Sequence, residues 1–74
     1  MSTKAAVDFL RGVLPEDIEV SMPGYQARRA VEVAHKGLSV HEAAAEEGVS
    51  VPVMRKSLAW AATNMERAIE EANS

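Results

Sequence analysis

Side chains suited to acid-base, nucleophilic or metal chemistry are sparse in this sequence and are not spaced for it. His35 and His41 do not fall on one helix face as a metal pair, and no clear third ligand accompanies them, so we expect both to face solvent. Adjacent helical residues point away from each other, so Glu46 and Glu47 do not form a catalytic carboxylate pair. The serines lack a glycine-rich elbow and ordered His and Asp partners. We therefore expect no enzyme, no metal, no cofactor and no small-molecule substrate.

Cations are the other chemically informative group, and they gather in the middle of the chain. The formal net charge is -3, which argues against a polyanionic partner because phosphate binding draws on local positive potential. The distribution is uneven, however. Acids occupy both flanks, and between them lie Arg28, Arg29, Lys36, Arg55 and Lys56. The centre of the molecule can therefore be basic while both ends are acidic.

The elements that must position these cations belong to one small domain. A chain of 74 residues has room for a single core, and such cores rely on well-packed helices, a partner or self-association. There is no cysteine and no apolar run of the roughly 20 residues that a membrane span needs, so we expect a cytoplasmic protein with no membrane partner. Alanine is abundant, and apolar residues do not alternate with polar ones. The sequence predicts an all-α fold.

Helical periodicity divides this fold into about four helices. Residues 1–14 carry an apolar stripe, and Pro15 ends the helix because the residue before a proline avoids the helical conformation. Residues 15–23 mix acids with apolar residues and a second proline, which predicts a connector with at most a short helical turn at its start. A second helix is expected over residues 24–36, where a glycine follows and ends it.

The clearest local signal in the sequence is the start of the next helix. Ser39 followed three residues later by Glu42 is a capping box, and Leu38 before it can pack on Ala43 as a hydrophobic staple. The helix that begins after this serine stops at Gly48 after only about two turns. A short helix and a tight turn therefore stand in sequence.

A longer helix follows that turn. Ser50 can cap it, and a proline is tolerated in its first turn because the early amides have no intrahelical partner. We expect it to run from Val51 to about Ala72, roughly 33 Å. Its apolar residues alternate spacings of four and three, as in a helix that packs lengthwise on another helix. They are Met54, Leu58, Ala61, Met65, Ala68 and Ala72.

Residues 38–58 resemble the helix-turn-helix family of small bacterial and phage DNA-binding proteins. The resemblance rests on Ala44 four residues before Gly48, on the turn at that glycine, and on Met54 and Leu58 six and ten residues after it. The alanine lies where the two helices cross closely, and a larger side chain would push them apart. The apolar residues fill the small core between the helices.

Two residues depart from the family pattern. Glu47 and Ser57 stand where the family usually has apolar residues, so we expect the core between the two helices to be thin. Glu42, Glu46 and Glu47 also leave the first of the two helices acidic, which opposes nearby phosphate.

The resemblance implies that the second helix enters the DNA major groove and that its N-terminal residues reach base edges. The residues that it places toward DNA are Ser50, Val51, Pro52, Arg55 and Lys56. Arg55 is the main candidate for reading a base because its fork can bond both acceptors of guanine, while Lys56 either does the same or pairs with phosphate. Ser39 is expected to donate to phosphate. Arg28, Arg29 and Lys36 either extend these phosphate contacts or, for the two arginines, form an ordinary solvated helix face.

One such unit makes few base contacts, so we expect a homodimer that reads two half-sites about 34 Å apart. The seam is expected on the last helix, with residues 59–73 extending it beyond the DNA-reading part. Trp60 lies off the main apolar stripe and either covers the N-terminal helix or sits in an interface. The seam residues are Leu58, Trp60, Ala61, Met65, Ala68 and Ile69.

The leading hypothesis is sequence-specific binding of double-stranded DNA, as a transcription regulator or as a recombination or packaging accessory factor. The alternative is a helical protein-interaction module, an adaptor or inhibitor of a host or phage protein, that does not bind DNA. The net acidity and the alanine- and methionine-containing last helix would then serve a protein partner.

Overall fold

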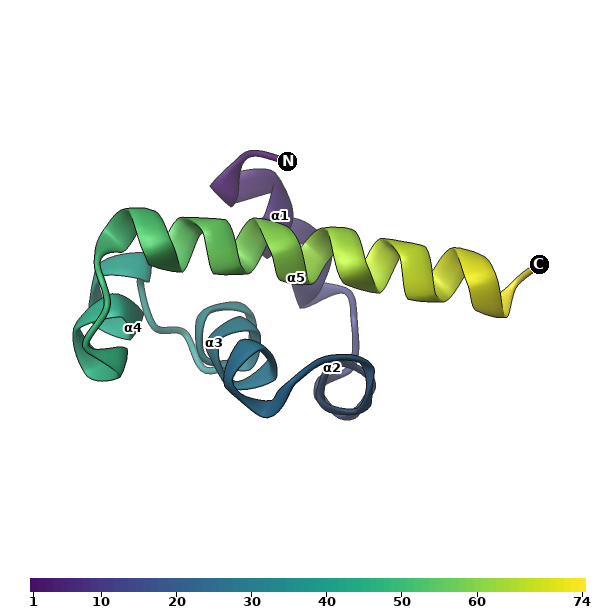
Figure 1. Ribbon diagram of the computed structural model, residues 1–74, viewed down its shortest axis with the longest axis horizontal. Coiled ribbons are helices and arrows are strands. Elements are labelled where there is room, and N and C mark those ends of the chain that lie inside the picture. The colour runs from purple at the N-terminus through teal and green to yellow at the C-terminus, as the bar shows by residue number, and fades with distance from the viewer.

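The computed structural model describes residues 1–74 as five helices and no strand, which confirms the all-α prediction. The elements are α1 (Thr3–Arg11), α2 (Pro15–Ser21), α3 (Gly24–Ala34), α4 (Val40–Glu47) and α5 (Val51–Ala72). α5 runs along the long axis of the molecule, 38 Å in extent, and the other four helices gather beside it (Figure 1). None of the five combines the length and apolar character that crossing a membrane requires.

The stretch predicted as a connector is the helix α2, so the molecule has five helices rather than about four. Pro15 occupies the first turn of α2, where its missing amide costs nothing, and acids follow it near the positive end of the helix. Ile18 is completely buried and fixes this short helix to the core. Asn64 of α5 donates from Nδ2 to the carbonyl of Ser21 at 2.9 Å and holds the other end. Tertiary contacts therefore stabilise a segment whose local pattern is weak.

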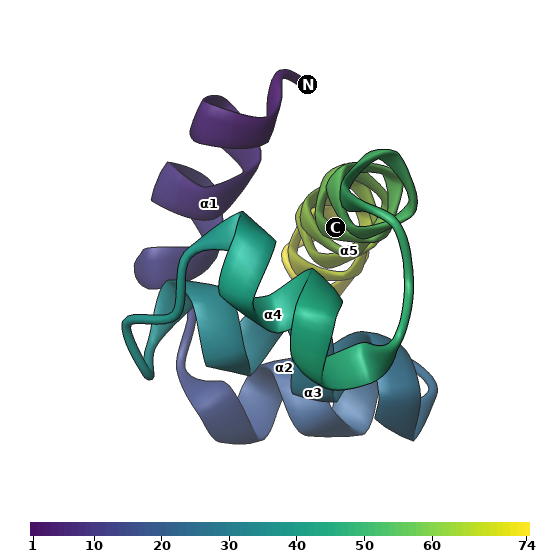
Figure 2. The ribbon, with the colours of Figure 1, turned by 90° about the vertical axis from the view of Figure 1, so that its left-hand side faces the viewer.

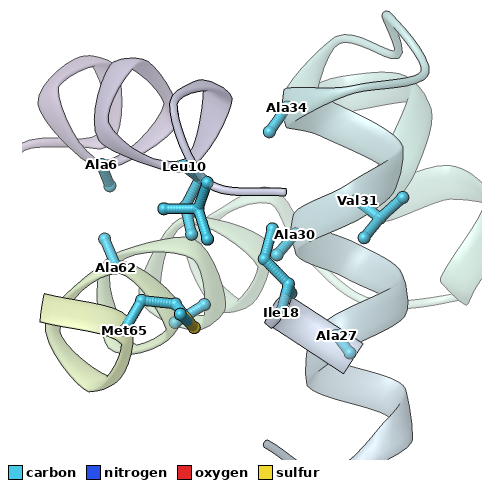
Figure 3. Close-up of a cluster of buried hydrophobic side chains, with 11 residues drawn as sticks. Ala6, Leu10, Ile18, Ala27, Ala30, Val31, Ala34, Ala62 and Met65 are labelled. Atoms are coloured by element: carbon cyan, nitrogen blue, oxygen red, sulfur yellow. The ribbon is translucent and has the colours of Figure 1, made fainter. Parts of the chain in front are cut away.

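The larger buried cluster joins α1, α2, α3 and α5. Figure 3 shows Leu10 of α1 facing Met65 and Ala62 of α5 on one side and Ile18 of α2 on the other. Small residues line the helix crossings, so the backbones approach closely: Ala6, Ala27, Ala30, Ala34, Ala61 and Ala62 are all buried. This cluster fixes the middle of α5.

A smaller cluster fixes α4 and the beginning of α5. It contains Ala43 and Ala44 of α4 with Met54 and Leu58 of α5. Val7 of α1 and Val33 of α3 complete the cluster. Figure 2 shows α4 crossing in front of α3, and the turn after α4 leading up to α5, which is seen nearly end-on. Ala44 is 2% exposed, so a larger side chain there would have no room.

Half of the seam predicted for a second copy lies in the chain's own core. Leu58, Ala61 and Met65 are at most 2% exposed and pack on helices of the same molecule. The heptad spacing marks a buried face, and the partner of that face is internal. Trp60 and Ile69 remain 43% and 41% exposed, but nine residues at about 100° each set them on opposite sides of α5. One seam cannot use both.

His35 connects α3 to the end of α1. Its Nε2 lies 2.7 Å from the carbonyl oxygen of Val13 and 3.2 Å from that of Leu10, so this nitrogen must carry the proton and donate. His35 is exposed, as expected, and its ring also bonds the backbone at the end of α1. The ring bonds carbonyls at the end of α1, which ends at Arg11 rather than near Leu14, and the Leu10 carbonyl also accepts the amide of Val13.

The predicted signals around α4 are confirmed. The amide of Ser39 donates to Glu42 Oε1 at 3.0 Å, and the amide of Glu42 donates to Ser39 Oγ at 3.1 Å, which completes the capping box. Leu38 packs against the smaller cluster that contains Ala43. Gly48 ends the helix with φ +69°, a left-handed conformation that costs a residue with a Cβ about 1–2 kcal/mol.

Gly48→Ala should lower the free energy of unfolding by about 1 kcal/mol. A Cβ at this position would meet no atom within 4 Å, so the loss comes from backbone strain alone. Gly24→Ala is the matched control, because it also has open space and lacks a positive φ. Urea denaturation of both variants tests this, and equal stabilities would contradict the conformational argument.

Candidate nucleic-acid interface

The first turns of α5 present two adjacent cations on their outward side. Met54 and Leu58 point into the core, whereas Arg55 and Lys56 are exposed. Neither cation takes part in an ion pair, unlike Arg28 and Arg29. Their charge is therefore available to a partner outside the molecule.

Both predicted capping serines lie at exposed helix starts. Ser39 Oγ accepts the amide of Glu42, and Ser50 Oγ accepts the amide of Val53 at 3.3 Å. Each hydroxyl hydrogen stays free to donate, so a serine can cap its helix and bond a phosphate oxygen at the same time. Next to Ser50, Val51 is half-buried against the smaller cluster and Pro52 is exposed. Of these two apolar residues, Pro52 offers more surface to a partner.

Arg28 and Arg29 both form ion pairs within the molecule, Arg28 at its surface and Arg29 nearly buried. Arg28 makes two bonds to the carboxylate of Glu47, from Nε at 2.9 Å and from its terminal nitrogen at 3.0 Å. Arg29 Nε donates to the same carboxylate at 3.2 Å. The predicted phosphate contacts therefore compete with internal ion pairs, most strongly for Arg29, whose side chain is 13% exposed.

Arg29 also reaches α5 and provides a partner for both Glu47 and Ser57, the two polar residues at positions where apolar side chains were expected. Its terminal nitrogen donates to Ser57 Oγ at 2.8 Å, and its guanidinium lies 5.1 Å from the centre of the Tyr25 ring. Ser57 is 6% exposed, and the Glu47 side chain is 10% exposed. The space between the helices is thus filled by a polar network of Arg29, Glu47 and Ser57 in place of apolar side chains.

Lys36 lies apart from the two cations of α5. It lines a shallow groove of about 230 Å³ with Glu19 and Arg28, on the side formed by α2 and α3. The structure therefore brings together Arg55, Lys56 and Ser50 at the start of α5, and it does not bring Lys36 to that surface.

Three carboxyls lie close together beside the polar network, those of Glu32, Glu46 and Glu47. Burial, followed by the neighbouring carboxyls of Glu46 and Glu47, raises the pKa of Glu32 above its ordinary value. Glu32 Oε1 is buried without a hydrogen-bond partner. The opposite holds for Glu47, because hydrogen bonds from Arg28, the largest cause, and from Arg29 lower its pKa against the effect of burial.

Sequence reasoning identified the positions of Glu47 and Ser57 as unusual but did not find their partner. The available signal was the pair of polar residues at expected core positions, since buried polar groups need hydrogen-bond partners. Arg28 and Arg29, on the preceding helix, could have supplied them. Tyr25 carries no such signal, because its ring contributes through its position one turn before Arg29.

Comparison with protein-family models, with curated proteins and with solved structures found no match for this chain. The structure contains no group of three or more His, Cys, Asp or Glu side chains placed to hold a metal ion. The functional argument therefore depends on the geometry and charge of the surfaces described above.

Glu47→Gln should lower the free energy of unfolding at pH 7 by about 2 kcal/mol, because it removes the charge that Arg28 and Arg29 share. The folded pKa of Glu47 is depressed, so its stabilisation is complete above the ordinary value of 4.5 and is lost as the pH falls through the folded value. The wild type and the variant should therefore converge in acid. Denaturation between pH 7 and pH 3 measures this, with exposed Glu71→Gln as the control. A pH-independent difference would contradict it.

Glu32→Gln should change stability in the opposite direction to Glu47→Gln and raise the free energy of unfolding at pH 7. The folded pKa of Glu32 is raised, so the wild type loses stability as the pH rises from the ordinary value of 4.5 through the folded value. A neutral amide avoids this cost, and the two proteins should converge below pH 4.5. Denaturation of both proteins between pH 7 and pH 3 tests this prediction. A variant that is less stable than the wild type at pH 7 would show that the ionised carboxyl of Glu32 does not destabilise the fold.

Proposed function

We propose that this chain binds double-stranded DNA through a helix-turn-helix unit made of α4, the Gly48 turn and α5. The observation that carries the proposal is the exposed, unpaired pair Arg55 and Lys56 on the outward side of the first turns of α5. The helix behind them is fixed by a buried apolar face, so the two cations are presented from a rigid support.

In the proposed complex the beginning of α5 enters the major groove, which is wide enough to admit a helix. Arg55 bonds the two acceptors of a guanine, and Lys56 either reads a base or pairs with phosphate. Pro52 offers only apolar contact, such as with a thymine methyl. The specificity of one unit therefore depends mainly on Arg55.

Phosphate contacts in the proposed complex come from the helix starts. The capping serines Ser39 and Ser50 have free hydroxyl hydrogens, and the first amides of α4 that the cap leaves without an intrahelical partner can also bond an anion. Arg28 and Arg29 support binding differently from the original expectation, since they offset the charge of Glu47 beside the turn. This lowers the repulsion that the acidic helix α4 would exert on phosphate.

A transcription regulator and a recombination or packaging accessory factor would use this surface in the same way. A protein-interaction module is the alternative, and it predicts no affinity for duplex DNA at any salt concentration. Fluorescence anisotropy with a labelled random-sequence duplex distinguishes the two. DNA binding through this surface should weaken as the salt concentration rises. Basic side chains that contact phosphates release counterions from the duplex, and this release becomes less favourable in more salt. Absence of binding at low salt would exclude the proposed function.

Arg55→Ala should weaken binding to a duplex selected from a random library by about 5- to 150-fold, which corresponds to one bidentate base contact of about 1–3 kcal/mol. Arg67→Ala is the matched control, since it removes an exposed, unpaired arginine from the same helix outside the proposed interface. We expect the control to change affinity less than about twofold. Equal losses in both variants would mean that net charge alone drives binding.

A further inference from the structure

The end of α5 carries an apolar face that its own molecule does not cover. Met65 is the last residue of this helix that is buried, and Ala68, Ile69 and Ala72 continue the same face at helical spacing. Ala68 is half-buried, Ile69 is 41% exposed and Ala72 is exposed. Figure 1 shows these last turns projecting beyond the other helices. We refer to residues 66–72 as the α5 tail.

The α5 tail is acidic around this apolar face. Glu66 and Glu71 flank the face on its two sides, and Glu70 lies on the outer side with Arg67. None of these four side chains forms an ion pair in the structure. A surface that covers Ile69 would therefore fit best if it were apolar at its centre and basic at its edge.

The same chain has such a surface in a groove between α1 and the start of α4. The groove has a volume of about 400 Å³, and its apolar wall is formed by Val7, Val33, Leu38 and Val40. Lys4 and Arg11 also line it, with side chains 87% and 60% exposed, and both pair with the single acid Asp8. One positive charge is left over in this trio, and we refer to this surface as the α1–α4 groove.

We propose that the α5 tail of one copy docks in the α1–α4 groove of a second copy. Ile69 would enter the apolar part of the groove, and the acids of the tail would meet Lys4 and Arg11 at its edge. Charge complementarity favours this pairing, because the tail has three acids against one arginine and the groove has two cations against one acid. The inference does not rest on the proposed DNA binding.

The arrangement would be head to tail. The groove lies on the half of the molecule that contains α4, and the tail projects from the other end of the 38 Å axis (Figures 1 and 2). Each docking event therefore leaves one free groove and one free tail, and further copies add in the same direction. Two tails placed face to face would instead bring Glu66 and Glu71 of one copy against the same acids of the other, which is repulsive.

The contact is small compared with the roughly 1,200 Å² of a stable interface, so we expect weak association, with a dissociation constant of about 10–100 µM. Sedimentation and light scattering of the protein without DNA, from about 10 to 500 µM, should show an average mass that rises with concentration. Ile69→Ser should abolish this rise, whereas Val20→Ser, which removes an 84% exposed valine of α2, should not.

A mixing experiment tests the head-to-tail geometry directly. Ile69→Ser inactivates the tail and leaves the groove, and Lys4→Glu with Arg11→Glu inactivates the groove and leaves the tail. Each variant alone should stay monomeric, and an equimolar mixture should form a dimer that does not grow further. Circular dichroism and urea denaturation establish that both variants fold, which we expect because all three substituted side chains are exposed. Glu70→Lys with Glu71→Lys should restore association to the groove variant by reversing the charge of its tail.

Three outcomes would overturn the inference. The wild type could remain a monomer of 8.0 kDa at every concentration. The groove variant alone could form a dimer, which would indicate that tails pair with each other. The mixture could fail to associate although both variants are folded and the wild type associates. None of these outcomes bears on duplex binding by Arg55, which the anisotropy experiment measures at low protein concentration.

Discussion

The guanidinium of Arg29 holds together the part of the molecule that could act on a partner. From α3 it bonds Glu47 at the end of α4 and Ser57 in α5, and it lies over the ring of Tyr25. Glu47 directly precedes the Gly48 turn, so this one side chain fixes both helices that the turn connects. Removing Glu47 would leave the nearly buried charge of Arg29 without compensation, which is the expensive case for ion pairs. Together with the buried cluster around Met54 and Leu58, this interaction fixes the inner side of α5, so that Arg55 and Lys56 face outward.

That interaction also decides where positive charge is found on the surface. The net charge of -3 would suggest an acidic molecule throughout, yet the acids are not evenly used. Glu47 is paired with Arg28 and Arg29, and Asp8 is paired with Lys4 and Arg11. Of the acids outside ion pairs, Glu66, Glu70 and Glu71 lie at the far end of α5 and the others lie on α2, α3 and α4, whereas the unpaired cations Arg55 and Lys56 lie near the beginning of α5. A single helix therefore separates two surfaces of opposite sign, and the total charge describes neither of them.

The sequence was sufficient for those features that are local. The capping box at Ser39, the Gly48 stop and the bounds of α5 depend on neighbours within one helical turn, and all were predicted. Helix α2 was missed because its stability comes from burying Ile18 and from the bond of Asn64 to Ser21, which lie far apart in the chain. The network around Arg29 was missed for the same reason, since its bond to Ser57 spans 28 residues and leaves no periodic trace. The spacing of Leu58 and Met65 correctly marked a buried face without telling which helix covers it.

Because α5 is rigid, substitutions at its two ends should act independently of each other. The core holds this helix from Met54 to Met65, so Arg55 and Ile69 project from one continuous element about 21 Å apart. Substitutions at that distance with no shared contacts contribute additively to free energies. An effect of one end on the other would therefore require a second molecule, either DNA that aligns several copies or a copy that occupies the groove beside Ser39. In that case the coupling would come from raised local concentration, and it would disappear when the copies are kept dilute and free of DNA.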